Sequence, residues 1–161
     1  MNLIALAFLV TAVIAFAAFH FLLIDIHVDP VLTGQSEERG WTIWVEVYEF
    51  LKDPDPGESQ AMIGVASFLA STALVIACPL LVPVFNRSHW LWWIAVLTSG
   101  AAMCGLGGVL LLSHSDPSYS VPGPAIYCLL AVLVLNFTGL LFIRREARPD
   151  IIDPVEALPE P

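Results

Sequence analysis

The chain has 161 residues, of which 58% are hydrophobic and 13% are charged. Soluble domains carry roughly 25% charged residues, so this composition, with a mean hydropathy of +0.81, excludes a soluble globular protein. The net charge of -9 at pH 7 excludes nucleic acid as a partner, because nucleic-acid binding depends on Lys and Arg side chains that neutralise phosphates.

Four apolar segments without Asp, Glu, Lys or Arg cover residues 3–24, 61–85, 90–112 and 125–143. A helix needs about 20 residues to cross a bilayer core of roughly 30 Å, and each segment has about this length. The sequence therefore predicts an all-α integral membrane protein with one domain, residues 1–147, built as a four-transmembrane-helix bundle. The loop sizes and the lack of an organelle-targeting segment favour a multi-pass protein of a bacterial cytoplasmic (inner) membrane.

Positive charges near the segment ends predict the orientation, because Lys and Arg flanks are retained on the cytoplasmic side. Arg87 lies between the second and third segments, and three arginines follow the fourth: Arg144, Arg145 and Arg148. Both sites fall on one side of a four-helix bundle. We therefore expect both termini in the cytoplasm and the loop over residues 25–60 outside it.

This outer loop carries nine acidic residues against two basic ones. Polar residues recur there at spacings of three or four, the period of a helix: Glu38, Thr42, Glu46, Glu49 and Asp53. The remaining positions are mainly apolar and include Trp41, Trp44 and Tyr48. The pattern predicts an amphipathic helix that lies on the outer membrane surface or across the mouth of the bundle.

A pair of strands is the alternative for the same segment. Trp, Ile and Val favour strands, and the apolar residues also alternate, at Trp41, Ile43, Val45 and Val47. The polar stripe fits the helical period of 3.6 better than the strand period of 2, so the helix is the favoured interpretation.

Each of the four apolar segments places a hydroxyl or amide near one level of the membrane: Thr11, Thr72, Ser99 and Asn136. Polar side chains inside a membrane are the strongest marks of function. Asn136 has two donors and an acceptor, and such groups hydrogen-bond across helices. We expect this polar layer to join the helices, and a constriction that passes water, a proton or a small solute is the alternative.

The third apolar segment carries small residues at a spacing of four. Ala101 and Gly105 form one such pair, and Cys104 and Gly108 form another. Small residues at this spacing let a neighbouring backbone approach closely. The neighbour is either another helix of this chain or another subunit. The three cysteines, which lie one in each of the last three segments, are expected to be apolar packing residues.

His20, His27 and His114 are expected near the outer face. Imidazole beside carboxylate can hold zinc or copper, and two histidines from different helices can hold haem. No HxxxH or HExxH spacing occurs, so we expect interfacial contacts, with a metal or haem site as the alternative. His89 and its neighbours Trp90, Trp92 and Trp93 predict an aromatic belt at the cytoplasmic face.

Residues 148–161 are acidic and rich in proline, which predicts a disordered cytoplasmic tail. No catalytic constellation is found in the sequence. We therefore expect a non-enzymatic structural or accessory subunit of a membrane complex, with other membrane subunits or further copies of the chain as partners. A small transport or channel protein built on the Asn136 layer is one alternative. A haem- or quinone-binding electron-transfer subunit that uses the outer histidines is the other.

Overall fold

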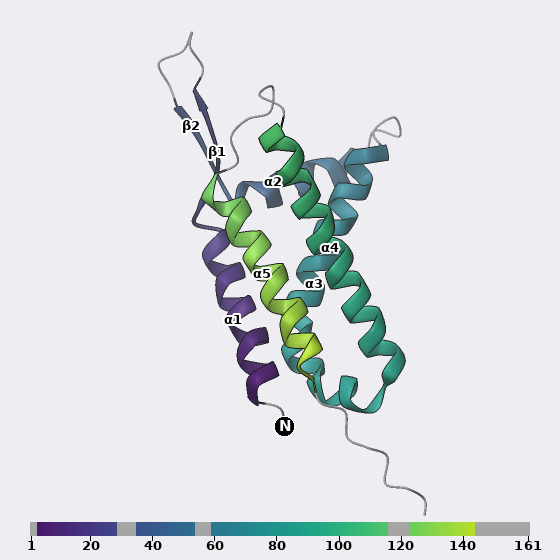
Figure 1. The fold of residues 1–161 in the computed structure, drawn as a ribbon. Helices are drawn as coiled ribbons and strands as arrows, with labels where there is room; N and C mark the ends of the chain where they lie inside the picture. The colour runs from purple at the N-terminus through teal and green to yellow at the C-terminus, as the bar shows by residue number, and fades with distance from the viewer. Residues whose placement is uncertain (1–2, 29–34, 54–58, 116–122, 144–161) are drawn as a thin grey trace, which may run out of the picture.

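The computed structural model describes residues 3–28, 35–53, 59–115 and 123–143. Four helices run side by side as a bundle, and a short helix and a β-hairpin lie at one end of it (Figure 1). The bundle helices are α1 (Leu3–Phe19), α3 (Ser59–Arg87), α4 (His89–Ser115) and α5 (Pro124–Leu141). The end elements are β1 (Leu23–Val28), β2 (Gln35–Arg39) and α2 (Thr42–Lys52).

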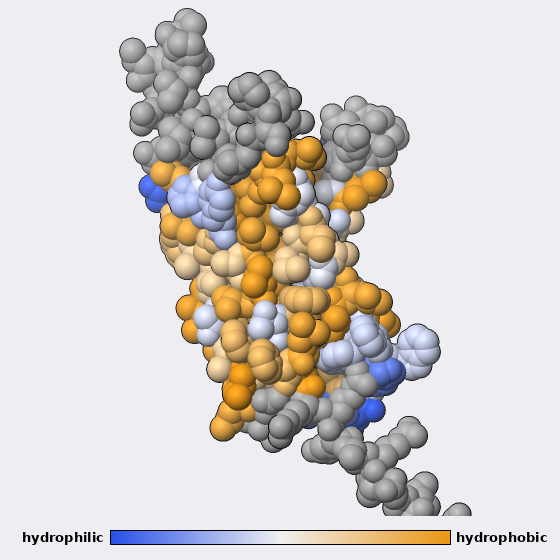
Figure 2. All heavy atoms as spheres, in the orientation of Figure 1, coloured by the Kyte–Doolittle hydropathy of each residue, from blue (hydrophilic) through white to orange (hydrophobic). Residues whose placement is uncertain are grey.

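Three of the bundle helices are long and apolar enough to cross a membrane: α3, α4 and α5. The 17 residues of α1 are equally apolar but make a shorter helix. Large hydrophobic side chains cover the outside of the bundle, as at Leu80 and Leu111, which are 79% and 73% exposed. Figure 2 shows this hydrophobic surface along the middle of the molecule. Such an exterior suits lipid rather than water, so the chain is a helical membrane protein.

The first apolar segment is divided, contrary to the prediction of one helix over residues 3–24. The helix α1 ends at Phe19, and a turn leads into β1 at Leu23. Its end is marked by tight backbone bonds, including the bond from the Leu22 N–H to the Phe19 carbonyl. Hydropathy could not reveal this boundary, because the residues that follow the helix are as apolar as those within it.

The outer segment contains both a strand pair and a helix, at different residues. The strands β1 and β2 pair antiparallel, with Ile26 opposite Glu37 and an irregularity between Leu23 and Asp25. The predicted helix is present as α2, but it begins at Thr42. Glu38 therefore belongs to β2 and not to the helical polar stripe, and the alternating residues from Trp41 to Val47 do not form a strand.

Glycines allow the hairpin to fold back onto the end of α1. A Cβ atom at Gly40 would collide with the backbone of Phe19 and His20. Gly40 instead donates its N–H to the Leu22 carbonyl at 2.9 Å. At the start of α5, Gly123 lies against the Leu23 and Ile24 carbonyls in the same way and donates its N–H to Ile24 at 2.6 Å. The hairpin is thus fastened to both α1 and α5.

The helices α1 and α5 make the most extensive contact in the described bundle. Gly139 of α5 permits this approach, since a Cβ atom there would lie 2.8 Å from the Cγ and Cδ2 atoms of Leu9. Leu9 and Leu140 are fully buried between the helices. At the opposite end from α2, Trp92 of α4 is buried and donates its indole N–H to the Leu140 carbonyl at 2.8 Å.

Candidate functional site

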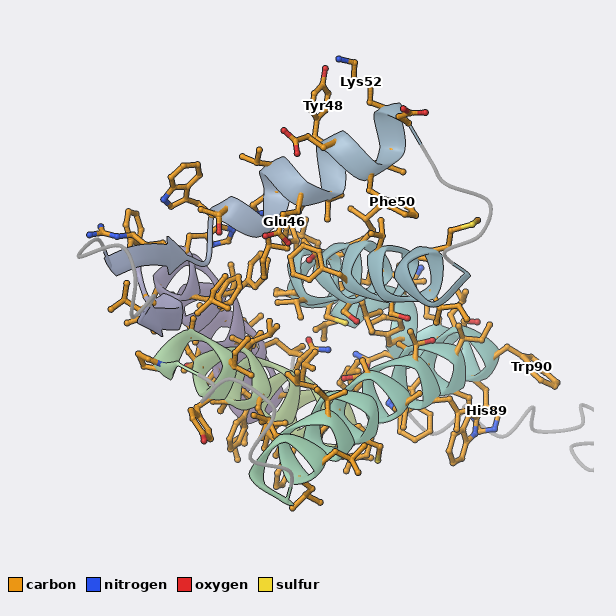
Figure 3. All side chains as sticks on the ribbon, turned by 90° about the horizontal axis from the view of Figure 1, so that it is seen from above. Glu46, Tyr48, Phe50, Lys52, His89 and Trp90 are labelled. Carbon is orange, nitrogen blue, oxygen red and sulfur yellow. The ribbon has the colours of Figure 1, made fainter. Side chains whose placement is uncertain are left out.

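The short helix α2 presents three distinct faces. The inner face, with Ile43, Trp44, Val47 and Phe50, is buried or half-buried, while Glu46 and Glu49 form an exposed acidic stripe. The third face is apolar and exposed, and it includes Trp41 at 53% and Tyr48 at 67%. In Figure 3, Phe50 points toward α3, whereas Tyr48 and Lys52 point away from the bundle.

A side-chain hydrogen bond joins α2 to the end of α1. The indole N–H of Trp44 donates to Nε2 of His20 at 2.8 Å, and the other ring nitrogen of His20, Nδ1, lies 2.8 Å from the Phe16 carbonyl. An indole N–H can only donate and a carbonyl can only accept. The geometry therefore requires a neutral His20 with its proton on Nδ1, which donates to Phe16.

Aromatic rings enclose this pair of residues. The His20 ring meets Phe16 edge to face at a centroid distance of 4.9 Å. The Trp44 ring meets Phe68 of α3 in the same way at 5.2 Å. Edge-to-face pairs of this kind add about 0.5–1.5 kcal/mol beyond the burial of their surface. The cluster Phe16, His20, Trp44 and Phe68 thus connects α1, α2 and α3 at one end of the bundle.

A cavity of about 860 Å³ extends from this cluster into the bundle. Phe16 and Phe68 belong to its lining, so the aromatic cluster forms one end of it. Its long walls come from α3, between Gly64 and Val75, and from α4, between Leu97 and Val109. The floor is made by Leu129, Val132 and Leu133 of α5. The lining is predominantly apolar, with four hydroxyl groups at Ser67, Ser71, Thr72 and Thr98.

The predicted polar layer is partly assembled. Asn136 is fully buried and donates from Nδ2 to the Ser99 hydroxyl at 3.2 Å, which joins α5 to α4. Thr72 of α3 is also buried, at 8% exposure. Thr11 lies elsewhere, because its side chain is exposed and bonds to the Ala7 carbonyl of its own helix at 2.8 Å. Three of the four residues are therefore inside the bundle.

The second polar atom of the Asn136 amide is poorly satisfied. Its oxygen Oδ1 is buried and has no hydrogen-bond partner of standard geometry among the described residues. An unpaired buried amide oxygen costs free energy, so this position is the least well-satisfied polar site in the middle of the described bundle.

The small residues of α4 are not covered by another helix of the described chain. Ala101, Cys104 and Gly105 are exposed. A Cβ atom added at Gly105 or Gly108 would meet no other helix within 4 Å among the described residues. Ala101 and Gly105 line the cavity, whereas Cys104 and Gly108 are not among its lining residues. We call Ala101, Cys104, Gly105 and Gly108 the small-residue face.

The other predicted positions are spread through the fold. His27 lies in β1, opposite Ser36 of β2, and His114 lies in the last turn of α4. No group of three His, Cys, Asp or Glu residues suited to a metal occurs within the described ranges. A metal at His20 would have to displace the bond from Trp44 or the contact with Phe16. The cysteines Cys78, Cys104 and Cys128 are free thiols.

The tryptophans of the predicted aromatic belt, at the end of the bundle opposite α2, differ in how far they are buried. Trp90 is 79% exposed and points away from the bundle (Figure 3), and Trp93 is 42% exposed with its indole N–H on His89. Trp92, in contrast, is a core residue. The sequence also contained no clear sign of the cavity or of the close approach at Gly139, because a single glycine and scattered alanines and serines have no distinctive spacing.

No family model matches the sequence, and no curated protein and no solved structure matches it either. The class of the protein is defined by its fold and composition, as a helical membrane protein with a short helix and a β-hairpin at one end of the bundle.

Proposed function

We propose that the protein is a non-enzymatic accessory subunit of a membrane complex, and that a partner helix docks on the small-residue face of α4. One observation supports this proposal above the others: Cys104 and Gly105 are exposed and no helix of the described chain covers the face. Lipid gives little driving force for helix association, so close contact of backbones becomes important. Small residues provide that contact.

The position of the face within the helix also supports a protein partner. Ala101 to Gly108 lie in the middle portion of α4, which spans His89–Ser115. Bulky side chains occupy exposed positions on either side of it, including Leu97 at 65% and Leu111 at 73%. A partner helix that crosses α4 at its glycines would come closest there and pack against the flanking leucines.

The proposal includes the membrane arrangement. We place both termini and Arg87 in the cytoplasm, with α1 as a fourth, shorter span and the membrane as a bacterial inner membrane. Then α2 lies at the outer interface, where Trp and Tyr side chains are favoured. Its exposed face, with Trp41 and Tyr48, would contact headgroups, while Glu46 and Glu49 would face water.

Photo-crosslinking from Cys104 tests the proposal. Cys78→Ala and Cys128→Ala leave Cys104 as the single thiol, which is then labelled with a benzophenone maleimide in native membranes. We expect one discrete protein adduct. The matched control carries the same probe at Ile14→Cys of α1, with Cys104→Ala added, because Ile14 is also exposed, at 64%. Lipid adducts alone at both positions, or the same protein adducts at both, would contradict a specific partner on α4.

A second candidate function is passage of water or a small solute past Asn136. The unpaired Oδ1 atom favours it, since a buried acceptor without a partner can bind a transient water or solute. The test is solute or proton flux in vesicles that contain the purified protein, with Asn136→Leu as the variant. Flux that the variant abolishes without a change in melting temperature would favour this function over the accessory one.

A further inference from the structure

The cavity between α3 and α4 is not explained by the proposed partner surface. We propose that it is a binding site for one acyl chain of a bilayer phospholipid from the leaflet on the α2 side. The acyl chain would enter from the side, between α3 and α4. It would lie along the helices, with its methyl end near the middle of the bundle. This inference goes beyond the accessory function and concerns a different occupant. The cavity shares two wall residues, Ala101 and Gly105, with the small-residue face, so a partner helix there would cover part of its open side.

The length of the cavity fits one acyl chain. Its wall on α3 extends from Gly64 to Val75 and its wall on α4 from Leu97 to Val109. At about 1.5 Å per helical residue, these walls are roughly 17–18 Å long. Half of a hydrocarbon core of roughly 30 Å is about 15 Å. The cavity therefore has about the length that one acyl chain spans in its own leaflet.

The chemistry of the walls favours hydrocarbon over water. A volume of about 860 Å³ is far larger than the voids of a well-packed interior, so a bound molecule must fill it in a membrane. A bound water needs two to four polar partners. The cavity offers four hydroxyl groups, at Ser67, Ser71, Thr72 and Thr98. Hydroxyl side chains on a helix can hydrogen-bond to the backbone of their own helix. The rest of the cavity wall then offers an apolar surface to an acyl chain.

The open side of the cavity faces the bilayer, not the water. Ala70 on α3 and Leu97, Ala101 and Val109 on α4 all line the cavity and are exposed. The end nearest α2 is instead occupied by Phe16 and Phe68, which contact the Trp44–His20 pair. An acyl chain therefore has lateral access from lipid, and the aromatic rings of Phe16 and Phe68 lie at the end of the cavity nearest α2.

Two variants of α3 provide a matched pair for the experiment. Ala70 and Ala73 are both exposed and lie three residues apart, but only Ala70 lines the cavity. Ala70→Phe should fill the space, whereas Ala73→Phe places the same ring at an exposed position that does not line the cavity. Neither residue belongs to the small-residue face. Loss of the proposed partner and loss of lipid binding are therefore distinguishable.

The probe is a phosphatidylcholine vesicle with a diazirine in the middle of the acyl chain, into which the full-length purified protein is reconstituted. After illumination, adducts are mapped by peptide mass. We expect them to concentrate on α3 between Gly64 and Val75 and on α4 between Leu97 and Val109, to be mostly lost in Ala70→Phe, and to persist in Ala73→Phe. The elution profile in detergent checks that both variants fold.

Three results would overturn the proposal. Adducts spread evenly over exposed residues outside the cavity, such as Ile76 and Leu80, would mean ordinary lipid contact. Labelling of Ala70→Cys by a water-soluble, charged thiol reagent would mean that the cavity is hydrated. Extraction of an isoprenoid rather than a phospholipid from protein purified out of native membranes would assign the cavity to another ligand. Retention of a phospholipid by the purified protein, together with loss of the cavity adducts in Ala70→Phe, would support the proposal.

Discussion

The indole N–H of Trp44 donates to Nε2 of His20 at 2.8 Å, and this bond fastens the short helix α2 to the end of α1. The two residues are 24 positions apart in the chain, with the β-hairpin between them. His20 bonds at the same time to the Phe16 carbonyl through Nδ1. The imidazole of His20 thus connects α2 to the end of α1, alongside the backbone bonds of Gly40 and Gly123 that fasten the β-hairpin.

The tautomer of His20 provides the first test. Nitrogen-15 chemical shifts of the labelled protein at neutral pH should show a neutral imidazole with its proton on Nδ1, because Nε2 accepts from Trp44. Trp44→Phe removes the donor and should shift the Nε2 signal of His20. His89 serves as the internal reference, since Trp93 donates to its Nε2 at 2.9 Å and Trp44→Phe leaves that bond untouched. A proton on Nε2 of His20 in the unaltered protein would refute the geometry.

Protease sensitivity of α2 tests the strength of the same bond. Trp44→Phe keeps an aromatic ring but loses a hydrogen bond worth about 1 kcal/mol, so α2 should detach more often and trypsin should cleave faster after Lys52. Trp41→Phe is the matched control because Trp41 is 53% exposed and lies on the outer face. Equal cleavage rates in the two variants would argue that burial alone holds α2 in place.

Much of the helical architecture was predictable, because an apolar segment of membrane length can satisfy its backbone hydrogen bonds in lipid by forming a helix. The segments at 61–85, 90–112 and 125–143 lie almost wholly within α3, α4 and α5. The end of α1 was not predictable in this way. Leu23 and Ile24 look like a continuing span by hydropathy, and only the pairing of β1 with β2 and the contacts of Gly40 and Gly123 make this segment extended.

The candidate site was predictable only in its parts. Asn136 and Ser99 were placed at one level by counting residues, and they are bonded. Thr11 has a similar depth, but its side chain points out of the bundle. Depth along the helix does not determine the direction in which a side chain points. His20 was singled out for its ring nitrogens, but its partner Trp44 could not be identified because the contact depends on how the hairpin returns the chain to α1.

Substitution of Asn136 tests whether the polar layer is dry. Asn136→Leu loses the Ser99 bond, worth on the order of 0.6 kcal/mol and up to about 2, and it also removes the unpaired Oδ1, so we expect a small change in melting temperature. Asn136→Asp puts a carboxylate at a fully buried position and should lower the melting temperature strongly. Thr11→Leu, at an exposed site, should have little effect. A stable Asn136→Asp protein would mean that water reaches this level.

Gly139 tests the close contact of α1 and α5. A methyl group there would lie 2.8 Å from the Cγ and Cδ2 atoms of Leu9. Overpacking of this kind costs roughly 1–3 kcal/mol of folding free energy. Gly139→Ala should therefore lower the melting temperature in detergent. Gly107→Ala is the control, since a Cβ atom there meets nothing within 4 Å among the described residues. It should be neutral or stabilising by up to about 1 kcal/mol. The reverse order of stabilities would contradict the observed contact.

Accessibility labelling tests the proposed orientation. In a background without native cysteines, Tyr48→Cys and Arg87→Cys both create thiols at exposed positions, at opposite ends of the bundle. A membrane-impermeant maleimide should label Tyr48→Cys in intact cells and Arg87→Cys only after the membrane is opened. Labelling of Arg87→Cys alone in intact cells would mean that the orientation is the opposite of the proposed one. Labelling of both positions in intact cells would rule out a bundle that spans the membrane.

The mass of the complex extracted gently from native membranes tests the proposed accessory role most directly. The chain itself has a mass of 17.5 kDa. Native mass spectrometry should give a larger, stoichiometric assembly for the unaltered protein and for Gly107→Leu. For Gly108→Leu, whose side chain would enlarge the small-residue face of α4, it should give the single chain with bound lipid. A single chain from the unaltered protein, or an assembly that Gly108→Leu leaves intact, would contradict a partner helix on this face.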